Sequence, residues 1–318
     1  MSKSIVLSTG SYLPKKILTN NDMSKIVETS DEWIFTRTGI KERHIAEHEE
    51  TTTYMAAMAA KEALKRSGLT SEDIDLIIVA TTTPDIIFPS TAARVQAIIG
   101  ATNAAAFDLQ AVCSGFLYGM SIADSMIKSG ASKNILLIGA ERMSSILDWT
   151  DRSTCVLFGD GAGAMILSKN PSNDNRGIIS SEIKANGCLE NILYTSSKTS
   201  TTKMPNSIVM EGKEVFKHAV QKMTSSMLNL LEKENLSTSD IDWVVPHQAN
   251  IRIIELISKR MEVPEERVIA TIDKHANTSA ASIPLAIDTF KHKFKKGDKI
   301  LMTAGGAGFT WGSVLLVW

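Results

Sequence analysis

The stretch LTSEDIDLIIV at residues 69–79 occurs a second time in the chain, as LSTSDIDWVVP at residues 236–246. Two further pairs follow in the same order and at nearly the same spacing. KNILL at 133–137 matches DKILM at 298–302, and GDGAGA at 159–164 matches GGAG at 305–308. Matches in one order at one spacing predict two related halves, residues 1–170 and 171–318. The seam falls in the polar, turn-rich segment 168–176, and the halves are expected to pack about a pseudo-twofold axis.

Around these repeats, short apolar runs alternate with longer amphipathic stretches. The runs 74–80, 135–139, 243–245 and 300–302 are apolar on both faces, which is typical of strands covered by helices on both sides, and a further strand is expected at 105–109. The periodicity predicts helices at 53–66, 116–128, 248–260 and 281–296. The fold class is therefore α/β.

Composition excludes several kinds of protein. The 318 residues include 34 Lys and Arg against 35 Asp and Glu, so no overall positive field exists to hold nucleic acid. No apolar run reaches the roughly 18 residues that cross a membrane. The 3 cysteines lie far apart without a CxxC pair, which favours a reducing cytoplasm, and the 6 histidines show no metal-ligand spacing. We expect a cytoplasmic protein without a metal site, and without nucleic-acid or membrane partners.

Three chemically capable side chains follow predicted strands. Cys113 lies between the strand 105–109 and the helix that starts near Ser114, His247 follows the strand 243–245, and Asn277 lies in a turn of small residues. Ligands of open α/β sheets bind at such strand ends. A helix N-terminus stabilises a thiolate, so we expect a lowered pKa for Cys113. Taken singly, each residue could instead be structural: an inert buried cysteine, a core histidine or a helix-capping asparagine.

Glycine loops and an aromatic–basic pair give weaker signals. The loop 159–164 resembles a dinucleotide fingerprint, but a strand follows it where that fingerprint requires a helix. The loop 305–308 is also followed by a strand, and its amides could form part of an oxyanion hole. Trp33 and Arg37 are four residues apart, so on a helix they could sandwich a purine or simply form a solvated helix end.

Together, these segments resemble a family of enzymes. Residues 31–43, 113–115, 246–250, the turn at Asn277 and 308–312 are similar, in this order, to β-ketoacyl-acyl carrier protein synthase III, the condensing enzyme that initiates type II fatty acid synthesis. The resemblance covers nearly the whole chain. It implies a thiolase-like fold, with two pseudo-twofold-related halves whose mixed sheets sandwich helices, and it implies a homodimer. It also implies that no cofactor is needed, because loss of CO₂ drives the reaction.

The resemblance further implies a set of roles. Cys113 would take the acyl group from acetyl-CoA or another short acyl-CoA, and malonyl-acyl carrier protein would then lose CO₂ and attack it. His247 and Asn277 would donate hydrogen bonds to the enolate. The main-chain amide of Cys113 would hold the second oxyanion, together with that of Gly306 or Ala307. This choice stays open because the family has three consecutive glycines where this chain reads Gly306-Ala307-Gly308.

Binding residues are implied in the same way. The residues that would bind CoA or line the substrate tunnel are Thr29, Trp33, Arg37, Phe88, Arg152, Gly212, Phe216, Ala249 and Asn250, with Phe88 reaching across the dimer. Acyl carrier protein would dock on Gln248, Ala249, Asn250, Ile251 and Arg252. Arg252 and Lys259 lie seven residues apart on one predicted helix face, and Lys213 and Lys217 would extend this basic patch.

Other functions remain open at this point. A degradative thiolase needs a second cysteine near its C-terminus, and no cysteine follows Cys188. An elongating condensing enzyme would have a histidine in place of Asn277, and His275 is two residues away. The remaining alternatives are a condensing enzyme of secondary metabolism, a Cys-His-Asn hydrolase, and a catalytically silent scaffold that binds acyl carrier protein.

Overall fold

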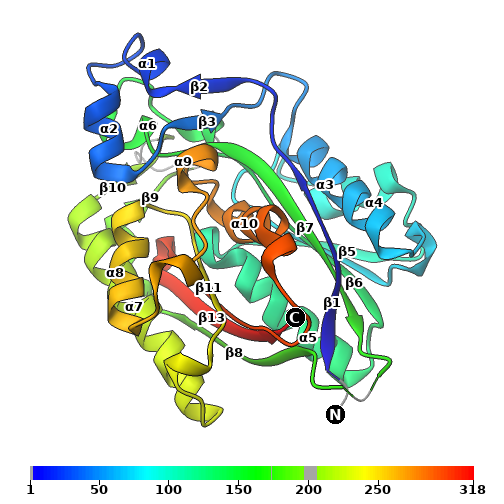
Figure 1. Ribbon diagram of the computed structural model, residues 1–318. Helices are drawn as coiled ribbons and strands as arrows, with labels where there is room; N and C mark the ends of the chain where they lie inside the picture. The colour runs from blue at the N-terminus through cyan, green and yellow to red at the C-terminus, as the bar shows by residue number, and fades with distance from the viewer. Residues whose placement is uncertain (1–2, 173, 197–205) are drawn as a thin grey trace.

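The computed structural model describes residues 3–172, 174–196 and 206–318, so residue 173 of the predicted seam lies outside the described part. The first of its two large sheets has five strands in the order β1-β7-β6-β4-β5 (Figure 1). These strands are β1 (Ser4–Tyr12), β7 (Asp160–Lys169), β6 (Asn134–Arg142), β4 (Leu76–Ala80) and β5 (Ala105–Leu109). β4 is parallel to β5 and β6, whereas β7 is antiparallel to β6 and β1, so the sheet is mixed.

The second sheet repeats this order with one strand fewer. Its strands run β11-β12-β13-β8, and they are β11 (Trp243–Pro246), β12 (Lys299–Gly306), β13 (Thr310–Val317) and β8 (Gly177–Ala185). β11 is parallel to β12, and β13 is antiparallel to both neighbours. A single parallel bridge between Val244 and Val268 stands where a fifth strand would pair with β11, as β5 pairs with β4.

Matching local hydrogen bonds explain why the two quoted stretches of sequence are alike. Thr70 and Asp73 form a capping box before β4, and Ser237 and Asp240 form the same box before β11. The next aspartate of each copy accepts from the N–H of the neighbouring strand, with Asp242 bonded to the Lys299 amide at 2.8 Å. Serine, threonine and aspartate recur at these positions because their side chains satisfy free backbone donors.

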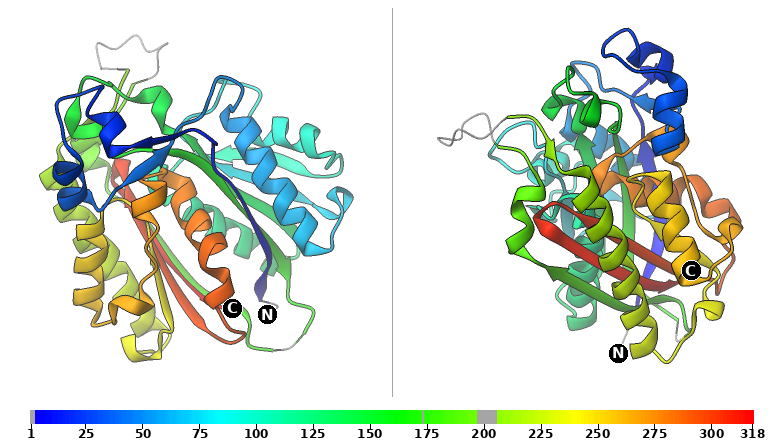
Figure 2. Two further views of the ribbon diagram at one scale, coloured as in Figure 1. Left: turned by 45° about the horizontal axis from the view of Figure 1, so that its top comes forward. Right: turned by 90° about the vertical axis from the view of Figure 1, so that its left-hand side faces the viewer.

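Helices form three further layers around and between the sheets. α3 (Thr52–Ser67) and α4 (Thr91–Ile99) cover the outer face of the first sheet, and α7 (Gly212–Lys233) covers that of the second with α8 (Ile251–Met261) packed beside it (Figure 2). α5 (Gly115–Ser129) and α10 (Ser282–Phe290) lie between the two sheets and contact strands of both. The predicted fold class, mixed sheets that sandwich helices, is confirmed. The division at residue 170 stays a prediction, since both halves share this central layer.

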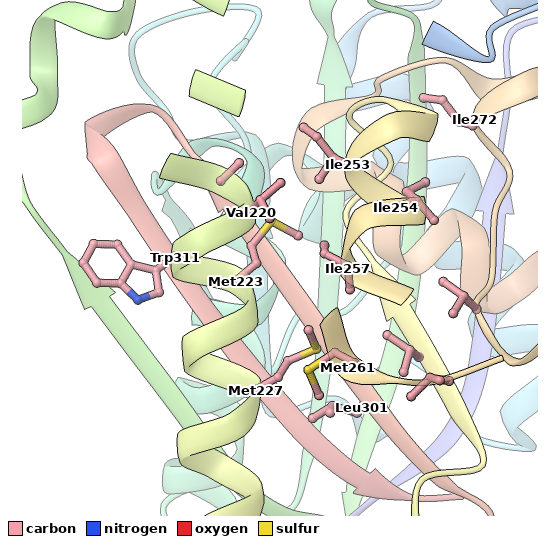
Figure 3. Packing of buried hydrophobic residues seen from close by; sticks show 14 of the residues in the cluster. Val220, Met223, Met227, Ile253, Ile254, Ile257, Met261, Ile272, Leu301 and Trp311 are labelled. Atoms are coloured by element: carbon pink, nitrogen blue, oxygen red, sulfur yellow. The ribbon is translucent and has the colours of Figure 1, made fainter. Parts of the chain in front are cut away.

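A hydrophobic core fills the space between the second sheet and its covering helices. Met223 and Met227 of α7, Ile257 of α8 and Leu301 of β12 are fully buried and point toward one another (Figure 3). The apolar stripes of both helices therefore face the strands, as amphipathic periodicity requires.

The remaining elements are short. They are β2 (Ile17–Thr19), α1 (Asn20–Met23), α2 (Asp31–Thr38), β3 (Glu42–His44), α6 (Arg152–Cys155), β9 (Leu193–Tyr194), β10 (Val209–Met210) and α9 (Ile272–His275).

Two predicted helices have different ends in the structure. The helix expected over 281–296 ends at Phe290, which allows Phe294 to leave the helical path and pack against Trp243, with ring centroids 5.6 Å apart. The helix expected from residue 248 begins at Ile251, because Asn250 caps it.

Candidate active site

Cys113 lies on a single 3₁₀ turn, η2 (Val112–Ser114), that connects β5 to α5. The turn is tight. The backbone of Val112 adopts a positive φ of 47°, which is rare for residues other than glycine. Gly306, the last residue of β12, packs directly on the cysteine. A Cβ atom on Gly306 would lie 2.8 Å from the Cys113 Cβ and 2.9 Å from its backbone nitrogen. Only glycine fits at this point of contact between the two halves.

The thiol of Cys113 is shielded from solvent. Only 6% of the residue is exposed, and burial raises its pKa to about 12. This is the opposite of the lowered pKa expected from the helix N-terminus. The cost of burying a thiolate outweighs other effects here, although a hydrogen bond from Ser279 works in the opposite direction. The resting cysteine is therefore a thiol, and its proton must go elsewhere before the sulfur can attack.

His247 follows β11 and is held at both its backbone and its ring. Its amide donates to the carbonyl of Thr303 on β12 at 2.8 Å, and its Nδ1 lies 2.6 Å from the hydroxyl of Ser282 on α10. The Ser282 hydroxyl also accepts from the Gln248 amide at 3.4 Å, which leaves its proton free to point at Nδ1. When Ser282 donates to Nδ1, the ring proton lies on Nε2. Burial lowers the pKa of His247 to about 3, so the imidazole is neutral at physiological pH.

Hydrogen bonds hold both the backbone and the side-chain amide of Asn277 in one orientation. Its backbone bonds to Leu157 and Gly159 at 2.9 and 3.0 Å, and its Oδ1 accepts from the Ser279 amide at 2.9 Å. With Oδ1 occupied, Nδ2 remains as a donor. Asn277 therefore caps the 3₁₀ turn η7 (Ser279–Ala281) and also presents an N–H group. Its capping role and its expected role as a donor to substrate are compatible.

One segment, residues 277–282, joins the three predicted catalytic residues. The Ser279 amide donates to Asn277 Oδ1, the Ser282 hydroxyl contacts the ring of His247, and Ser279 acts to lower the pKa of the Cys113 thiol against the larger effect of burial. The turns η2 and η7 are in contact, one from each half of the chain. The structure thus brings together a thiol, a neutral imidazole and an amide donor in a buried place.

The glycine loop of the second half borders this place. Gly306 is buried and extended against Cys113, whereas Ala307 is partly exposed and begins the turn η9 (Ala307–Phe309). The Thr310 hydroxyl lies 3.0 Å from the carbonyl oxygens of both Ala111 and Ala307, and so ties the two loops together. The loop is positioned to offer amides near the sulfur.

A cluster of aromatic and basic side chains lies between α2 and α6. The guanidinium carbons of Arg37 and Arg152 each lie 4.6 Å from the centroid of the Trp33 ring. The Thr29 hydroxyl nearby is buried without a hydrogen-bond partner. The predicted pairing of Trp33 with Arg37 is present, and Arg152 joins it, so the indole lies between two cations. Such an array suits a flat ring and phosphate groups.

The N-terminal part of α7 and the length of α8 flank a groove. Arg252, Lys259 and Phe216 line it together with Glu255 and Glu265, so the groove carries both signs of charge. Gly212 is exposed at the first position of α7.

The residues that were predicted to dock acyl carrier protein lie at the turn before α8, and they differ in their exposure to solvent. Asn250 bonds to the Arg37 carbonyl at 3.1 Å and links this groove to the aromatic–basic cluster, and Ala249 and Ile251 are partly exposed. Gln248 is fully buried, and its amide bonds to Pro246, Ile269 and Thr271 inside the protein. Its predicted role in docking is therefore corrected to a structural one.

Phe88, which was predicted to reach across the dimer, lies at the surface of the chain. It is 82% exposed, and its neighbour Ile87 is 73% exposed, in the loop between β4 and α4. These adjacent exposed apolar side chains make the loop a candidate surface for contact with another molecule.

Sequence reasoning missed three residues of the site: Glu141, Ser279 and Ser282. Glu141, on β6, is fully buried and accepts hydrogen bonds from three threonines and from Ser279. The run of small polar residues after Asn277 was the one available signal for the serines, and no local pattern marked Glu141.

Comparison with known proteins shows the family of this chain. Residues 107–187 match the family model for 3-oxoacyl-[acyl-carrier-protein] synthase III, and residues 231–318 match the model for its C-terminal part. The β-ketoacyl-[acyl-carrier-protein] synthase III of Ehrlichia canis is 54% identical over 99% of both chains, and that of Wolbachia pipientis wMel is 55% identical over 99% of both. The chain belongs to this synthase III family. The crystal structure of the Aquifex aeolicus member superposes with a TM-score of 0.94, at 51% identity, and covers 99% of this chain and 100% of that one.

Family membership confirms the sequence-based prediction of a condensing acyltransferase of fatty acid synthesis with a thiolase-like fold. Within the described ranges, no group of three His, Cys, Asp or Glu side chains is placed to hold a metal ion. A search of the same ranges found no helix that is both long and apolar enough to span a bilayer.

Proposed function

We propose that this synthase III joins an acyl group from a short acyl-CoA, acetyl-CoA in particular, to malonyl-acyl carrier protein, and that Cys113, His247 and Asn277 carry the reaction. The observation that supports these roles is the segment 277–282, which carries Asn277, packs against the turn of Cys113 and contacts the His247 ring through Ser282. In the first step, the Cys113 sulfur attacks the thioester carbonyl and CoA leaves. An amide pair, Cys113 with Gly306 or Ala307, stabilises the oxyanion.

In the second step, malonyl-acyl carrier protein enters and loses CO₂. The charge that develops is an enolate, and it needs hydrogen-bond donors that are already in place. Nε2–H of His247 and Nδ2–H of Asn277 supply them, because the other polar atom of each side chain is occupied by Ser282 and Ser279. The enolate carbon then attacks the acyl-cysteine and gives 3-oxoacyl-acyl carrier protein.

The binding surfaces follow from the same arrangement. The CoA nucleotide lies on the cluster of Trp33, Arg37 and Arg152, and Thr29 offers its free hydroxyl. The pantetheine arm passes Gly212, Phe216, Ala249 and Asn250. Acyl carrier protein docks on the groove beside α8 through Arg252, with Ala249, Asn250 and Ile251 beneath it.

Two further assignments belong to the proposal. The protein is a homodimer in the cytoplasm, in which Phe88 of one protomer enters the partner and closes its acyl pocket. It works without a cofactor, since the thiol, the imidazole, the amides and the loss of CO₂ supply all the chemistry that the reaction needs.

The two half-reactions test the roles of the three residues. Cys113→Ser is expected to abolish acyl transfer from acetyl-CoA, because a hydroxyl is a far weaker nucleophile than a thiolate. His247→Ala and Asn277→Ala are expected to slow CO₂ release from malonyl-acyl carrier protein by about 100-fold or more while Cys113 is still acylated. Mass spectrometry of the acyl-enzyme and a count of released CO₂ measure the two steps. Equal loss of both steps in the His247 and Asn277 variants contradicts the enolate role, and transfer of the acyl group to water identifies a hydrolase.

A further inference from the structure

Arg43, on β3, is a buried cation that the proposed mechanism does not use. It has no exposed surface, and burying a guanidinium costs free energy unless hydrogen bonds replace the lost water. Its Nη1 donates to the Leu18 carbonyl of β2 at 3.1 Å, and its Nη2 donates to Asn20 Oδ1 at 3.0 Å and to the Val156 carbonyl at 2.9 Å. These three acceptors are uncharged oxygens, so the contacts fix geometry rather than neutralise the charge. Arg43 ties together segments up to 113 residues apart in the chain.

Asn20 extends the contact of Arg43 to both ends of α2. Asn20 is also buried, and its Nδ2 donates to Asp31 Oδ1 at 2.8 Å and to the Ile40 carbonyl at 2.7 Å. Asp31 is the first residue of α2, and Ile40 directly follows the C-cap of this helix. One side chain thus holds the helix at its start and just beyond its end, and the oxygen of that side chain is held in turn by Arg43.

The Val156 carbonyl extends the contact of Arg43 in the other direction, to α6. Val156 is the C-cap of α6, whose first residue is Arg152. Arg152 also donates to the Glu28 carbonyl at 2.9 Å, in the segment that leads into α2. α2, α6 and β3 lie together at one end of the molecule (Figure 1). Trp33 and Arg37 come from α2 and Arg152 comes from α6, so the spacing of these two helices determines the space that the aromatic–basic cluster offers to a ligand.

We propose that Arg43 is a positioning residue, which holds α2 and α6 at the spacing that the CoA nucleotide requires and so sets the preference for acyl-CoA over thioesters without a nucleotide. This role rests on the proposed binding of CoA to the aromatic–basic cluster. Arg43 has no exposed surface, so it acts through the two helices and does not touch the ligand. The planar guanidinium presents its donors in fixed directions, whereas a lysine ammonium is a compact charge on a flexible stem.

Arg43→Lys separates geometry from charge. The variant keeps a positive charge but cannot hold three oxygens of separate segments at once. CoA binding, measured by calorimetry, is expected to weaken about tenfold, and KM for acetyl-CoA in the acylation of Cys113 is expected to rise about tenfold, because small misplacements of binding groups are costly. The acylation rate at saturating acetyl-CoA should stay within about twofold of the wild type. S-Acetyl-N-acetylcysteamine, a thioester without a nucleotide, should acylate both proteins at the same rate.

Asn20→Asp is a second variant, and it leaves Arg43 in place. The substitution keeps the size of the side chain and the acceptor for Arg43, but it removes the N–H group that bonds to Asp31 and Ile40. The same loss of CoA affinity is expected, again without a change in acylation by the truncated thioester. This variant decides the question if Arg43→Lys fails to fold, which circular dichroism checks.

Arg66→Lys is the matched control. Arg66 also connects two distant segments, since it bonds to the Thr9 carbonyl of β1 and to Asp288 of α10, but neither segment carries a residue of the aromatic–basic cluster. This variant is expected to bind CoA as tightly as the wild type does.

The outcomes separate the role of Arg43 from the proposed function. Wild-type CoA affinity in Arg43→Lys or in Asn20→Asp overturns the positioning role. So does equal slowing of acylation by acetyl-CoA and by the truncated thioester, because Arg43 would then support the fold as a whole. A wild-type protein that does not prefer acetyl-CoA over the truncated thioester contradicts the proposed nucleotide site instead.

Discussion

At His247, a serine hydroxyl is the partner of one ring nitrogen. Ser282 Oγ is 2.6 Å from Nδ1 and also accepts from the Gln248 amide, and the proposed enolate role requires that Ser282 donate its own proton to Nδ1. The burial that keeps the imidazole neutral makes this choice important, since a neutral ring donates from one nitrogen alone. In the proposed mechanism, Ser282 is therefore a positioning residue for the decarboxylation step.

Removing the Ser282 hydroxyl tests this positioning. In Ser282→Ala the ring can adopt either tautomer, and CO₂ release from malonyl-acyl carrier protein is expected to fall by about 10- to 100-fold, as for other residues that orient a catalytic ligand. Acylation of Cys113 by acetyl-CoA is expected to change little. Thr289→Ala is a matched control, because that hydroxyl lies on the same helix but bonds only to the Leu285 carbonyl. Equal slowing of both half-reactions would show that Ser282 has a general structural role.

The site residues that could be predicted from the sequence are those with a local signal. Cys113 and His247 each follow a strand, and Asn277 lies in a turn of small residues. Glu141 and Ser282 gave no such signal, because their partners are distant in the chain. Ser279 is 138 residues from Glu141, and Ser282 is 35 residues from His247. Only the packing of β6, η7 and α10 against one another brings these groups together.

At the level of the elements, the end of β12 determines how closely the two halves approach. Gly306 leaves no space for a side chain beside Cys113. The contact is with backbone and Cβ atoms, which cannot move aside as the tip of a flexible side chain could. The position of Cys113, the proposed nucleophile, therefore depends on a strand from the other half.

Adding one methyl group at this position is expected to displace Cys113. In Gly306→Ala, acyl transfer should fall by about 100-fold or more, since misplacement by an ångström costs this much. The acyl-enzyme burst measures the loss, and circular dichroism checks the fold. Gly187→Ala is the control, because a Cβ there meets nothing within 4 Å. Wild-type acylation by the Gly306 variant would mean that the two turns can separate without consequence.

The helix α8 presents a mixed surface rather than a wholly basic one. Arg252 and Lys259 lie in one groove with Glu255 and Glu265. An acidic carrier protein would therefore depend strongly on the few cations present, and reversal of one charge would leave the groove mainly acidic.

Arg252→Glu tests this docking surface. Use of malonyl-acyl carrier protein is expected to weaken about tenfold in low salt, mainly through slower association, and the difference should shrink as salt is added. Acylation by acetyl-CoA should not change, because the CoA nucleotide is proposed to bind the aromatic–basic cluster instead. Lys65→Glu, an exposed lysine on α3, is the control. If the Arg252 variant matches the wild type in low salt, Arg252 does not contact the carrier protein.

The ends of some helices depend on tertiary contacts, which cannot be predicted from the hydrophobic periodicity of the sequence. The strands 76–80 and 243–246 and the helix 52–67 lie within a few residues of their predicted ranges, because each has a continuous apolar face and a capping residue. The helix that was predicted to continue to residue 296 ends early, because Phe294 packs on distant aromatic rings instead.

For the whole molecule, the central layer prevents either half from standing alone. α5 comes from the first half and α10 from the second, and each contacts strands of both sheets. Their buried residues belong to one cluster, with Phe116 and Met120 of α5 packed together with Ile283 and Ile287 of α10. The repeat could be predicted from the sequence, but this sharing of one core could not, since the pattern of each helix shows only that it has an apolar face.

The loop that carries Phe88 is the surface proposed to pair two copies of the chain. Replacing this 82% exposed phenylalanine by aspartate removes an apolar anchor and introduces a charge that is unfavourable in a dry interface. Phe88→Asp is expected to shift the protein from dimer to monomer in light scattering at micromolar concentration, and to reduce acyl transfer. Leu228→Asp, at another exposed apolar side chain, on α7, is the control. A Phe88→Asp protein that remains fully dimeric would place the dimer contact elsewhere.

The duplication within one chain has a further consequence for the chemistry. The turns η2 and η7 face each other, with Cys113 at the centre of one and Ala280 at the centre of the other. In a symmetric pair of identical chains, any residue in one turn would also occur in the other, so two thiols would crowd the same small space. Covalent fusion removes this restriction. One copy could specialise in nucleophilic attack while the other retained only donors, and a single asymmetric reaction centre could arise at the axis of a nearly symmetric fold.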